Sequence, residues 1–596
     1  MTQLSVLHGQ SVLTDLDVHF ARLMCRLAGD SSELALGAAL VSNRTTNGHV
    51  CLNLAVEAGQ RGIDTPPLNH WQTVLRKSSV VGQPGDYCPL ILDETGRLYL
   101  YRYWEYEQEL AAALTERAGQ LDDAVDEEQL RSGLNQLFPA ASDGEVDWQK
   151  LAAAAAVINR FSVISGGPGT GKTNTVIRIL ALLRQQPGGM DLNIALAAPT
   201  GKAAARLQES IHQAKQGLAV DDAVREAIPE QASTLHRLLG ANPDSVYFRH
   251  NRDNPLPVNV LILDEASMVD IALMAKLMRA LPQQAKLVML GDKDQLASVE
   301  AGAILADICG NNPGYSTDFT ARLTALSGEN LPQQKTPVPP ISDSIMLLRR
   351  SYRFGEKSGI GQLAAAVNQG RGEQCLALIQ DDDYPDISQI SDHESIAQQA
   401  AMIYRGYLER LKEGAAAGAV FEAFNSFRVL CAIRHGPVGV ALLNRDIEAC
   451  LAGWGLVDVS DIYYAGRPII ITRNDHSLQL YNGDVGILLP DPDSGGLIRA
   501  CFQGSDEVIR KVAPVRLPEH ETVYAMTVHK SQGSEFDRVL LVLPDEDVPV
   551  LSRELLYTGI TRARSRFEIS ALSGVMQAAV ARQLHRSSGL GDLLWL

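Results

Sequence analysis

Residues 166–173 read GGPGTGKT and match the phosphate-binding pattern GxxxxGK[ST]. An apolar run at 161–165 precedes them and is typical of a buried strand, and the amphipathic stretch that follows is typical of a helix. In this context glycines let backbone N–H groups turn toward phosphate oxygens at a helix N-terminus. We therefore predict an ATP site in which Lys172 contacts the β- and γ-phosphates and Thr173 holds Mg²⁺. The loop itself consists of Gly166, Gly167, Pro168, Gly169, Thr170 and Gly171.

Further polar residues follow two other apolar runs. Asp264 and Glu265 end the run VNVLIL, and Gln295 lies in KLVMLGDKDQL. Because the carboxyl ends of parallel strands meet at one edge of a sheet, we expect these side chains beside the phosphate loop. Asp264 would complete the Mg²⁺ site opposite Thr173, and Glu265 would act as the general base on the attacking water. Gln295 would sense the γ-phosphate, and Gln149 in DWQKL would read an adenine edge.

The elements that must position these residues alternate along the chain from residue 151. Apolar runs at 161–165, 193–197, 258–263 and 286–290 are separated by helical patterns, which predicts a parallel sheet covered on both faces. A second pattern of this kind has strands near 428–433 and 538–543. Between those strands, short apolar runs joined by turn pairs such as Asn482–Gly483 favour a small β-barrel or meander. Residues 311–345 are expected to form a long surface loop, because their prolines oppose regular structure.

Eight motifs, in this order, resemble those of superfamily 1 helicases. They span 149–566 and read GGPGTGKT, AAPTGKAAARL, STLHRLLG, LILDEAS, GDKDQLASV, RRSYRFG, YAMTVHKSQGSEFD and LLYTGITRARSRF. The variants STLHRLLG, NGDVGI and TVHKSQGSEFD resemble the 5′→3′ branch, and the whole pattern is similar to the RecD subunits of RecBCD enzymes (exodeoxyribonuclease V).

The resemblance implies an α/β fold with two RecA-like P-loop NTPase domains, each built on a parallel sheet. It also implies a separate N-terminal domain and a small inserted SH3-like β-barrel, which in this branch can hold single-stranded DNA or a separating pin. The expected divisions are a partner-binding N-terminal domain at 1–110, an acidic helical connector at 111–148, a first RecA-like domain at 149–345, a second at 346–465 and 519–596, and the insertion at 466–518.

The resemblance also implies site residues beyond those derived above. Arg353 in RRSYRFG and Arg562 in YTGITRAR would come from the second domain and stabilise charge in the transition state of ATP hydrolysis. The neighbouring Arg349, Arg350 and Arg564 are alternatives. Hydroxyls, backbone N–H groups and single cations can hold DNA phosphates without reading sequence. The implied DNA contacts are Pro199, Thr200, Gly201, Lys202, Thr234, His236, Thr527, His529, Lys530 and Ser531. Tyr524 could stack on a base, although a core position suits it better.

The charge of this 596-residue chain is unevenly distributed. The formal net charge is −17, of which residues 1–150 carry −10 and residues 151–596 carry −7. More than half of the acidity therefore lies where no helicase motif falls. This predicts weak DNA affinity for the isolated chain and an N-terminal face suited to protein partners, and it excludes a broadly basic DNA coat.

The cysteines and the N-terminus point to a cytoplasmic protein with reduced thiols. The eight cysteines form no CxxC pair and lie near no histidine cluster, so we expect no zinc or iron–sulfur site. The first residues, MTQLSVLHGQ, do not resemble a signal peptide, and the longest apolar run, 151–158, is too short to span a membrane.

The resemblance implies an ATP-dependent 5′→3′ DNA helicase or translocase that acts on the 5′-ended strand at duplex ends. The resemblance implies a motor subunit in a heterotrimer with RecB-like and RecC-like subunits, used in double-strand break repair by homologous recombination and in degradation of linear DNA. No grouped Asp, Glu and Lys set lies apart from the ATP site, so a nuclease centre is expected in another subunit. The alternatives are a stand-alone 5′→3′ helicase and a nucleotide-gated binding protein without translocation. The second α/β unit opposes the latter.

Overall fold

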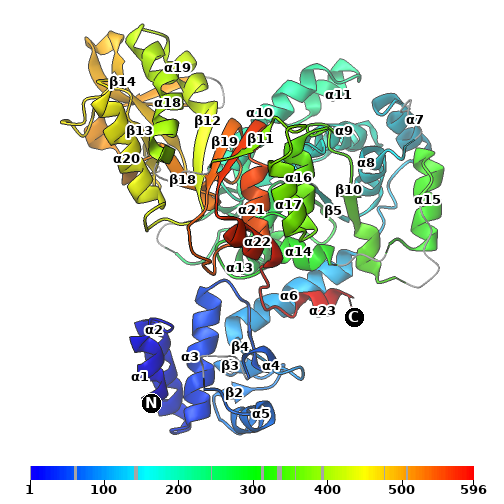
Figure 1. Ribbon diagram of the computed structural model, residues 1–596. Helices are drawn as coiled ribbons and strands as arrows, with labels where there is room; N and C mark the ends of the chain where they lie inside the picture. The colour runs from blue at the N-terminus through cyan, green and yellow to red at the C-terminus, as the bar shows by residue number, and fades with distance from the viewer. Residues whose placement is uncertain are drawn as a thin grey trace.

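A computed structural model describes residues 2–58, 64–139, 145–242, 245–310, 314–331, 338–355, 357–390, 395–475, 477–504 and 508–595. Figure 1 shows three parts: an N-terminal domain in blue, a first sheet unit in blue-green to green, and a second sheet unit in green to red. No helix within the described ranges is long and apolar enough to cross a membrane.

Helices and a small sheet of order β1-β4-β3-β2 build the N-terminal domain. Its helix α2 begins with a capping box, in which the Thr14 hydroxyl accepts from Asp17 N and the Asp17 side chain accepts from Thr14 N. The buried Asp17 also accepts from Ser42 Oγ at 2.6 Å and thereby joins α2 to α3. The elements are α1 (Thr2–Gly9), α2 (Asp15–Ala28), α3 (Ser32–Thr46), β1 (Leu52–Asn53), α4 (Leu54–Glu57), α5 (Leu68–Arg76), β2 (Val81–Gly82), β3 (Leu90–Leu92) and β4 (Arg97–Leu100).

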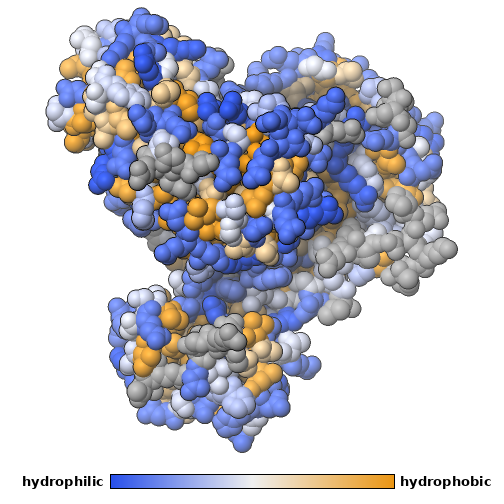
Figure 2. All heavy atoms as spheres, viewed as in Figure 1, coloured by the Kyte–Doolittle hydropathy of each residue, from blue (hydrophilic) through white to orange (hydrophobic). Residues whose placement is uncertain are grey.

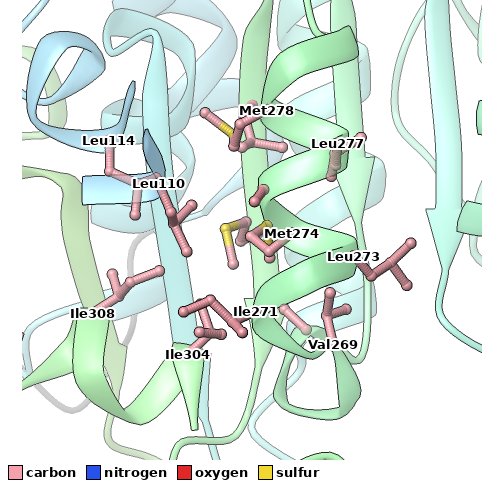
Figure 3. Packing of buried hydrophobic residues seen from close by; sticks show 14 of the residues in the cluster. Leu110, Leu114, Val269, Ile271, Leu273, Met274, Leu277, Met278, Ile304 and Ile308 are labelled. Carbon is pink, nitrogen blue, oxygen red and sulfur yellow. The ribbon is translucent and has the colours of Figure 1, made fainter. Parts of the chain in front are cut away.

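Two helices, α6 (Tyr101–Arg117) and α7 (Glu127–Leu137), connect this domain to the first sheet unit. The expected boundary at residue 110 is wrong, because α6 runs through it without a break. Leu110 and Leu114 on α6 pack against Met274 and Met278 of α13 (Ile271–Ala280), as Figure 3 shows. Arg279 of α13 also donates to Glu109 of α6 at 2.5 Å and adds an ion pair to this contact.

The first sheet has the order β10-β5-β9-β8-β6-β7, and all its ladders are parallel. Each predicted strand in this part is confirmed to within two residues. The strands are β5 (Phe161–Gly166), β6 (Ile194–Ala198), β7 (Ala232–Thr234), β8 (Val260–Leu263), β9 (Lys286–Gly291) and β10 (Ile345–Leu348). The helices are α8 (Trp148–Ile158), α9 (Lys172–Gln185), α10 (Gly201–Gln216), α11 (Asp222–Ala227), α12 (Leu235–Leu239), α13, α14 (Ile304–Cys309) and α15 (Thr317–Ser327).

Helix α15 and strand β10 correct two expectations. Part of the predicted loop 311–345 is helical: Ser316 caps α15, and Phe319, Leu323 and Leu326 bury one face of it against α7 and α8. The prolines on which the loop prediction rested, Pro332, Pro337, Pro339 and Pro340, all follow this helix. The expected domain boundary at residue 345 is also wrong, because β10 pairs with β5 and continues the first sheet to residue 348.

The second sheet is also parallel, with the order β11-β20-β19-β12-β18. Its two predicted strands are confirmed to within two residues. The strands are β11 (Ile387–Gln389), β12 (Phe427–Cys431), β18 (Ala525–Thr527), β19 (Phe536–Val542) and β20 (Ala563–Ser570). The helices are α16 (Gly359–Asn368), α17 (Gly372–Ile379), α18 (Ile396–Lys412), α19 (Ala417–Asn425), α20 (Val440–Gly453), α21 (Arg553–Ile560) and α22 (Ser573–Ala581).

The predicted insertion is an antiparallel sheet of order β16-β15-β14-β13-β17. Its strands are β13 (Pro468–Ile471), β14 (Val485–Asp491), β15 (Leu497–Gln503), β16 (Ile509–Val512) and β17 (His520–Thr522). The insertion ends later than the expected residue 518, because β17 pairs with β13. Among the described residues no ladder joins β16 to β17, so the SH3-like closed barrel stays a prediction.

The last described residues leave the second sheet unit and return to the N-terminal domain and α6 (Figure 1). Val50 N donates to Ser587 O at 2.8 Å, and Gly589 N donates to the buried carboxylate of Glu107 at 2.8 Å. The final helix, α23 (Leu590–Trp595), packs on α6 and α14, and Trp595 Nε1 donates to a backbone oxygen of α14 at 3.1 Å. We call residues 582–595 the C-terminal tail. It joins all three parts of the molecule.

Gly589→Ala is expected to weaken the docking of the C-terminal tail. A Cβ at this position would lie 2.6 Å from Glu107 Oε1 and 2.7 Å from Tyr99 Oη, both in buried side chains. Overpacking of this kind costs about 1–3 kcal/mol. Proteolysis of the tail should become faster and thermal unfolding should shift downward. Gly591→Ala is the control, because its Cβ would meet nothing within 4 Å. Equal behaviour of the two variants would contradict the docked geometry.

Acidification is expected to release the same tail. Ser587 N donates to His49 Nδ1 at 3.0 Å, which requires an unprotonated ring nitrogen. Burial, helped by Arg44 and Arg586, lowers the pKa of His49 to about 4, whereas a free histidine has a pKa of about 6.5. His49 therefore binds a proton more tightly when the tail is released than when it is docked. Docking should be intact above about pH 6.5 and weaken as the pH falls toward 4.

Limited proteolysis of the tail between pH 7.5 and 5 measures this effect. In His49→Asn, whose side chain does not titrate, the rate should change less with pH. An unaltered pH dependence in that variant would assign the effect to other groups.

Candidate functional site

The predicted ATP and DNA residues occupy different strand ends of the first sheet. The sheet is parallel, so every strand end leads into the same edge. In sheet order, β10 leads into the segment 349–353 and β5 leads into the phosphate loop. Next to them, β9 leads into residues 292–295 and β8 leads into residues 264–265. The neighbouring β6 and β7 lead into the predicted DNA residues 199–202 and 234–236. The strand order thus brings the ATP residues together and sets the DNA residues beside them.

The phosphate loop joins β5 to α9 as the sequence predicts. Gly169 and Gly171 have φ angles of +76° and +79°, in the left-handed region that favours glycine. A Cβ on Gly169 would collide with Arg353, and one on Gly167 would lie 2.8 Å from Tyr557 Oη. Lys172 Nζ donates to the loop's own carbonyls, Gly166 O at 2.5 Å and Gly167 O at 3.1 Å. The loop is thus a glycine-lined cradle with an ammonium group inside it, which suits a phosphate chain.

Gln149 lies against this loop in a way that the sequence did not specify. Its side chain is buried, and Nε2 donates to Thr170 O at 2.9 Å. A Cβ on Gly171 would meet the same amide. In this arrangement Gln149 supports the loop backbone, and its predicted contact with adenine stays a prediction.

Asp264 and Glu265 follow the buried strand β8, where a cation site was predicted. Glu265 has a φ of +51°, which is strained for a residue with a side chain, and strained backbone of this kind often occurs at functional sites. Its N–H donates to Asp264 Oδ1 at 2.8 Å. Burial raises the pKa of Asp264, and the charge of Glu265 raises it further. Carboxylate and hydroxyl oxygens are the ligands that Mg²⁺ prefers, so Asp264 with Thr173 fits that ion.

Arg353 reaches the cradle from an unexpected place. It was expected from the second domain, but it follows β10 of the first sheet, and Tyr352 N donates to Gly169 O at 2.7 Å. Arg353 Nη2 donates to Glu535 Oε2 at 2.7 Å, and its Nη1 is buried with no hydrogen-bond partner among the residues that the structure describes. A buried cationic donor left unsatisfied beside the phosphate cradle fits an anionic ligand.

Glu535 is the second-unit residue that holds Arg353, and it also pairs with Arg206 of α10. Burial alone would raise the pKa of this carboxyl, but Arg206 and Arg353 lower it to about 2. The three side chains therefore form a charged junction between the two sheet units, close to Asp264 and Glu265, whose charges act on Arg206.

Arg562 and Gln295 meet directly across the two units. Arg562 Nη2 donates to Gln295 Oε1 at 2.6 Å, and Gln295 Nε2 donates to Asp292 Oδ2 at 3.0 Å. Both side chains are at least nine-tenths buried. Leu296 N donates to Thr558 Oγ1 at 2.9 Å in the same junction. The predicted γ-phosphate sensor and the predicted arginine of the second unit therefore belong to one hydrogen-bonded network.

The three alternative arginines have other contacts. Arg349 lies over the Trp148 ring at 4.5 Å, and Arg350 lies over the Tyr352 ring at 5.5 Å. Arg564 contacts the same Glu535 oxygen as Arg353, Nε to Oε2 at 3.2 Å, but its side chain is about half exposed. This geometry favours Arg353 and Arg562 as the arginines of the site.

The predicted DNA residues of the first unit lie at two helix starts. Thr200 caps α10 by accepting from Ala203 N at 3.2 Å, and Thr234 caps α12 by accepting from Arg237 N at 3.2 Å. Backbone N–H groups at helix starts are suited to phosphates. His236 is exposed and contacts the Phe248 ring edge to face. Burial lowers the pKa of Lys202 to about 8, and nearby Arg428 lowers it as well.

The second unit contributes the predicted loop after β18. Thr527 Oγ1 accepts from Lys530 N at 3.3 Å, and Lys530 and His529 are half-buried. The predicted DNA contact of the Ser531 side chain does not fit the structure. This side chain is fully buried, and its hydroxyl donates to Val528 O at 2.7 Å. It shapes the loop and does not present its hydroxyl to a DNA strand. Tyr524 is confirmed as a core residue, fully buried in the second unit.

Sequence reasoning missed several residues of the junction, namely Arg206, Asp292 as a bonding partner, Glu535 and Tyr557. All four lie inside or beside quoted motifs, AAPTGKAAARL, GDKDQLASV, YAMTVHKSQGSEFD and LLYTGITRARSRF. Their position in a motif was the available signal, but their pairing across the two units leaves no local pattern.

Comparisons with known proteins match the three parts in order. The model of the RecBCD enzyme subunit RecD N-terminal domain matches residues 9–99, an AAA domain model matches 149–301, and a UvrD-like helicase C-terminal domain model matches 522–567. A solved Bacteroides Pif1 helicase in complex with ADP-AlF3 and single-stranded DNA aligns over 72% of this chain and 91% of its own, at 18% identity and a TM-score of 0.36.

Similar proteins extend over almost the whole chain. The RecBCD enzyme subunit RecD of Mycobacterium tuberculosis is 39% identical over 97% of this chain and 94% of its own length. That of Haemophilus influenzae is 36% identical over 99% of both. The ATP-dependent RecD2 DNA helicase of Deinococcus radiodurans is 31% identical over 82% of this chain and 57% of its own. The chain therefore belongs to the family of the RecD subunit of the RecBCD enzyme.

Proposed function

We propose that this chain is an ATP-dependent DNA helicase that moves 5′→3′ along single-stranded DNA as the RecD motor of a RecBCD-like complex. The main support for the proposal is the Arg562–Gln295 hydrogen bond. This bond joins an arginine of the second sheet unit to a glutamine beside the phosphate loop of the first, as a shared ATP site requires. A nucleotide-gated binding protein needs only one such unit. A site shared by two units changes their spacing when it closes and opens, as a motor requires.

The residues divide the work of ATP hydrolysis. Lys172 and the loop N–H groups would bind the β- and γ-phosphates, and Thr173 with Asp264 would hold Mg²⁺. When bound, Mg²⁺ would neutralise charge that develops on the phosphate oxygens. Glu265 would accept a proton from the attacking water. Arg353 and Arg562 would stabilise the transition state, and Gln295, held by Arg562, would report the γ-phosphate to the second unit.

The same junction connects the ATP site to the proposed DNA site. Gln532 follows the loop 527–531 directly, and its Nε2 donates to Leu296 O, next to Gln295, at 2.9 Å. Thr200 and Thr234 of the first unit and Thr527 of the second would each hold strand phosphates. Closing of the ATP site would then move one set of phosphate contacts relative to the other, which is the step of a translocase.

Glu265→Gln is expected to retain ATP binding and lose turnover. Glutamine has the same shape but cannot accept the proton, and loss of a general base costs about 10²- to 10⁴-fold. Binding of a fluorescent ATP analogue and steady-state hydrolysis measure the two properties separately. Glu209→Gln, an exposed carboxyl on α10, serves as control. Wild-type turnover in Glu265→Gln would place the base elsewhere.

Strand displacement tests polarity and unwinding together. The full chain, alone and with its co-purified partners, is given duplexes with a 5′ tail, a 3′ tail or blunt ends. The proposal predicts ATP-dependent unwinding of the 5′-tailed duplex by the chain alone. Unwinding of only the 3′-tailed duplex would overturn the proposed direction. ATP hydrolysis without unwinding of any duplex would favour the nucleotide-gated binding protein without translocation.

We propose that the N-terminal domain contacts the RecB-like and RecC-like partners. The complex would act in the cytoplasm, where it would repair double-strand breaks and degrade linear DNA. Helix α2 exposes Leu16, Leu23 and Leu27 by 67%, 41% and 60%, all on one face. Figure 2 shows hydrophobic side chains on the N-terminal domain where Figure 1 places α1 and α2. Arg22 and Arg26 border this face, which fits an apolar partner surface with acidic flanks.

Co-purification with tagged full-length chain tests this contact. Leu23→Glu combined with Leu27→Glu should lose two large partner subunits, whereas Met402→Glu, an exposed residue on α18, should retain them. Absence of any stoichiometric partner from the wild-type chain would favour a stand-alone helicase. Wild-type recovery of both partners by the double variant would move the contact away from α2.

A further inference from the structure

Tyr557 on α21 extends from the second unit into the cradle of the first. Its ring is buried, and its hydroxyl donates to Asp292 Oδ2 at 3.0 Å. A Cβ on Gly167 would lie 2.8 Å from the same hydroxyl, so this oxygen lies against the phosphate loop. The hydroxyl therefore touches the loop and the end of β9 at once.

Asp292 depends on the donors that surround it. Its carboxylate is 2% exposed, and burial raises its pKa. The charge of Lys172 and the hydrogen bonds from Asp294 N and Gln295 Nε2 lower this pKa, and Tyr557 Oη is a third hydrogen-bond donor to the carboxylate. Tyr557 is the donor among these three that comes from the second unit.

The carboxylate in turn fixes the orientation of Gln295. A side-chain amide carries a donor and an acceptor and can be turned over between them. Because Asp292 only accepts when ionised, it holds Nε2 and leaves Oε1 toward Arg562. The four side chains form a chain of three hydrogen bonds that starts at Tyr557 on α21 and ends at Arg562, just after the same helix.

We propose that Tyr557 is a positioning residue for ATP hydrolysis: through Asp292 it orients Gln295 and Arg562 relative to the phosphate loop. This inference rests on the proposed function. It assigns the tyrosine of LLYTGITRAR a role in setting the closed geometry of the site, separate from binding of the nucleotide. The effect should therefore fall on kcat and leave the KM for ATP largely unchanged.

Tyr557→Phe in the full chain removes the hydroxyl alone. We expect kcat for single-stranded-DNA-stimulated hydrolysis to fall about 10- to 100-fold, the scale of a small misplacement of reacting groups, with KM for ATP changed by less than about threefold. The matched control is Tyr404→Phe, since that hydroxyl is equally buried and donates to Tyr524 O in the second unit's core. Tyr404→Phe should lower the thermal unfolding temperature at least as much as Tyr557→Phe does, while leaving kcat unchanged.

A double-mutant cycle tests the route through Asp292. In an Asp292→Asn background, Tyr557→Phe should lower kcat by less than about threefold, because the group on which it acts is already lost. An undiminished loss in that background would overturn the inference, and so would wild-type kcat in Tyr557→Phe. A wild-type chain without ATP hydrolysis overturns the proposed function and this inference together. An active wild type with an equally active Tyr557→Phe overturns the inference alone.

Discussion

Lys172→Gln is expected to lower ATP hydrolysis by at least about 100-fold while the fold survives. The ammonium group donates to Gly166 O and Gly167 O, which belong to the loop itself, so its loss removes no hydrogen bond between separate elements of the fold. A cation positioned at the phosphates stabilises charge that develops in the transition state, and removal of one such donor costs about 10²- to 10³-fold. Steady-state hydrolysis and thermal unfolding measure the two effects.

Lys215→Gln is the matched control for this loss. Lys215 lies at the end of α10 and pairs with Glu230 at 2.6 Å, outside the proposed site. It should retain wild-type turnover. Comparable turnover of the two variants would mean that the cradle at 166–173 is not where ATP reacts.

Arg562→Ala is expected to reduce kcat by about 1,000-fold, the lower end of what an arginine finger contributes. All three of its hydrogen bonds stay inside the junction, to Thr558 O, Ser534 O and Gln295 Oε1. Removing the guanidinium leaves the two carbonyls without this donor, so unfolding should also become easier by about 1–3 kcal/mol. Binding of a fluorescent ATP analogue should change much less than turnover.

Arg538→Ala separates the two effects in the same sheet. Arg538 pairs with Glu568 through two hydrogen bonds, away from the ATP site. It should lose stability without losing turnover. If Arg562→Ala hydrolyses ATP at the wild-type rate, the site does not include the second unit, and the two-unit mechanism is wrong.

The sequence was most informative where chemistry is local. A strand, a glycine turn with positive φ and a helix N-terminus are adjacent in the chain, so the residue pattern alone places the elements of 161–185. The same holds for Asp264 and Glu265 at the end of β8. The second unit was indicated by its own alternating pattern, with strands near 428–433 and 538–543, and the ordered motifs then related it to the second domain of a helicase.

Contacts between segments far apart in the chain could not be predicted from local sequence patterns. Tyr557 meets Asp292 across 265 residues, and Ser587 meets His49 across 538. Such contacts leave no periodic trace in the chain. The domain boundaries failed for the same reason, because β10 and β17 are short strands whose sheet is decided by their partners, Ile345 with Val163 and Ile469 with Thr522.

Helix α15 is a different kind of miss. Its signals were local and readable: a Ser316 cap, apolar residues Phe319, Leu323 and Leu326 at helical spacing, and a Gly328 end in the left-handed conformation. The later prolines dominated the interpretation of the whole segment. Ser531 failed for a third reason, since a motif assigns a residue to a loop but does not say which way its hydroxyl points.

ATP hydrolysis by the full chain with and without single-stranded DNA tests the central claim most directly. The ATP residues and the DNA residues lie on neighbouring strand ends and are joined through Gln532, Leu296 and Gln295. The two-unit mechanism therefore predicts a rate that rises several-fold with single-stranded DNA and that Lys172→Gln abolishes in both conditions. A rate that is the same with and without DNA would contradict it.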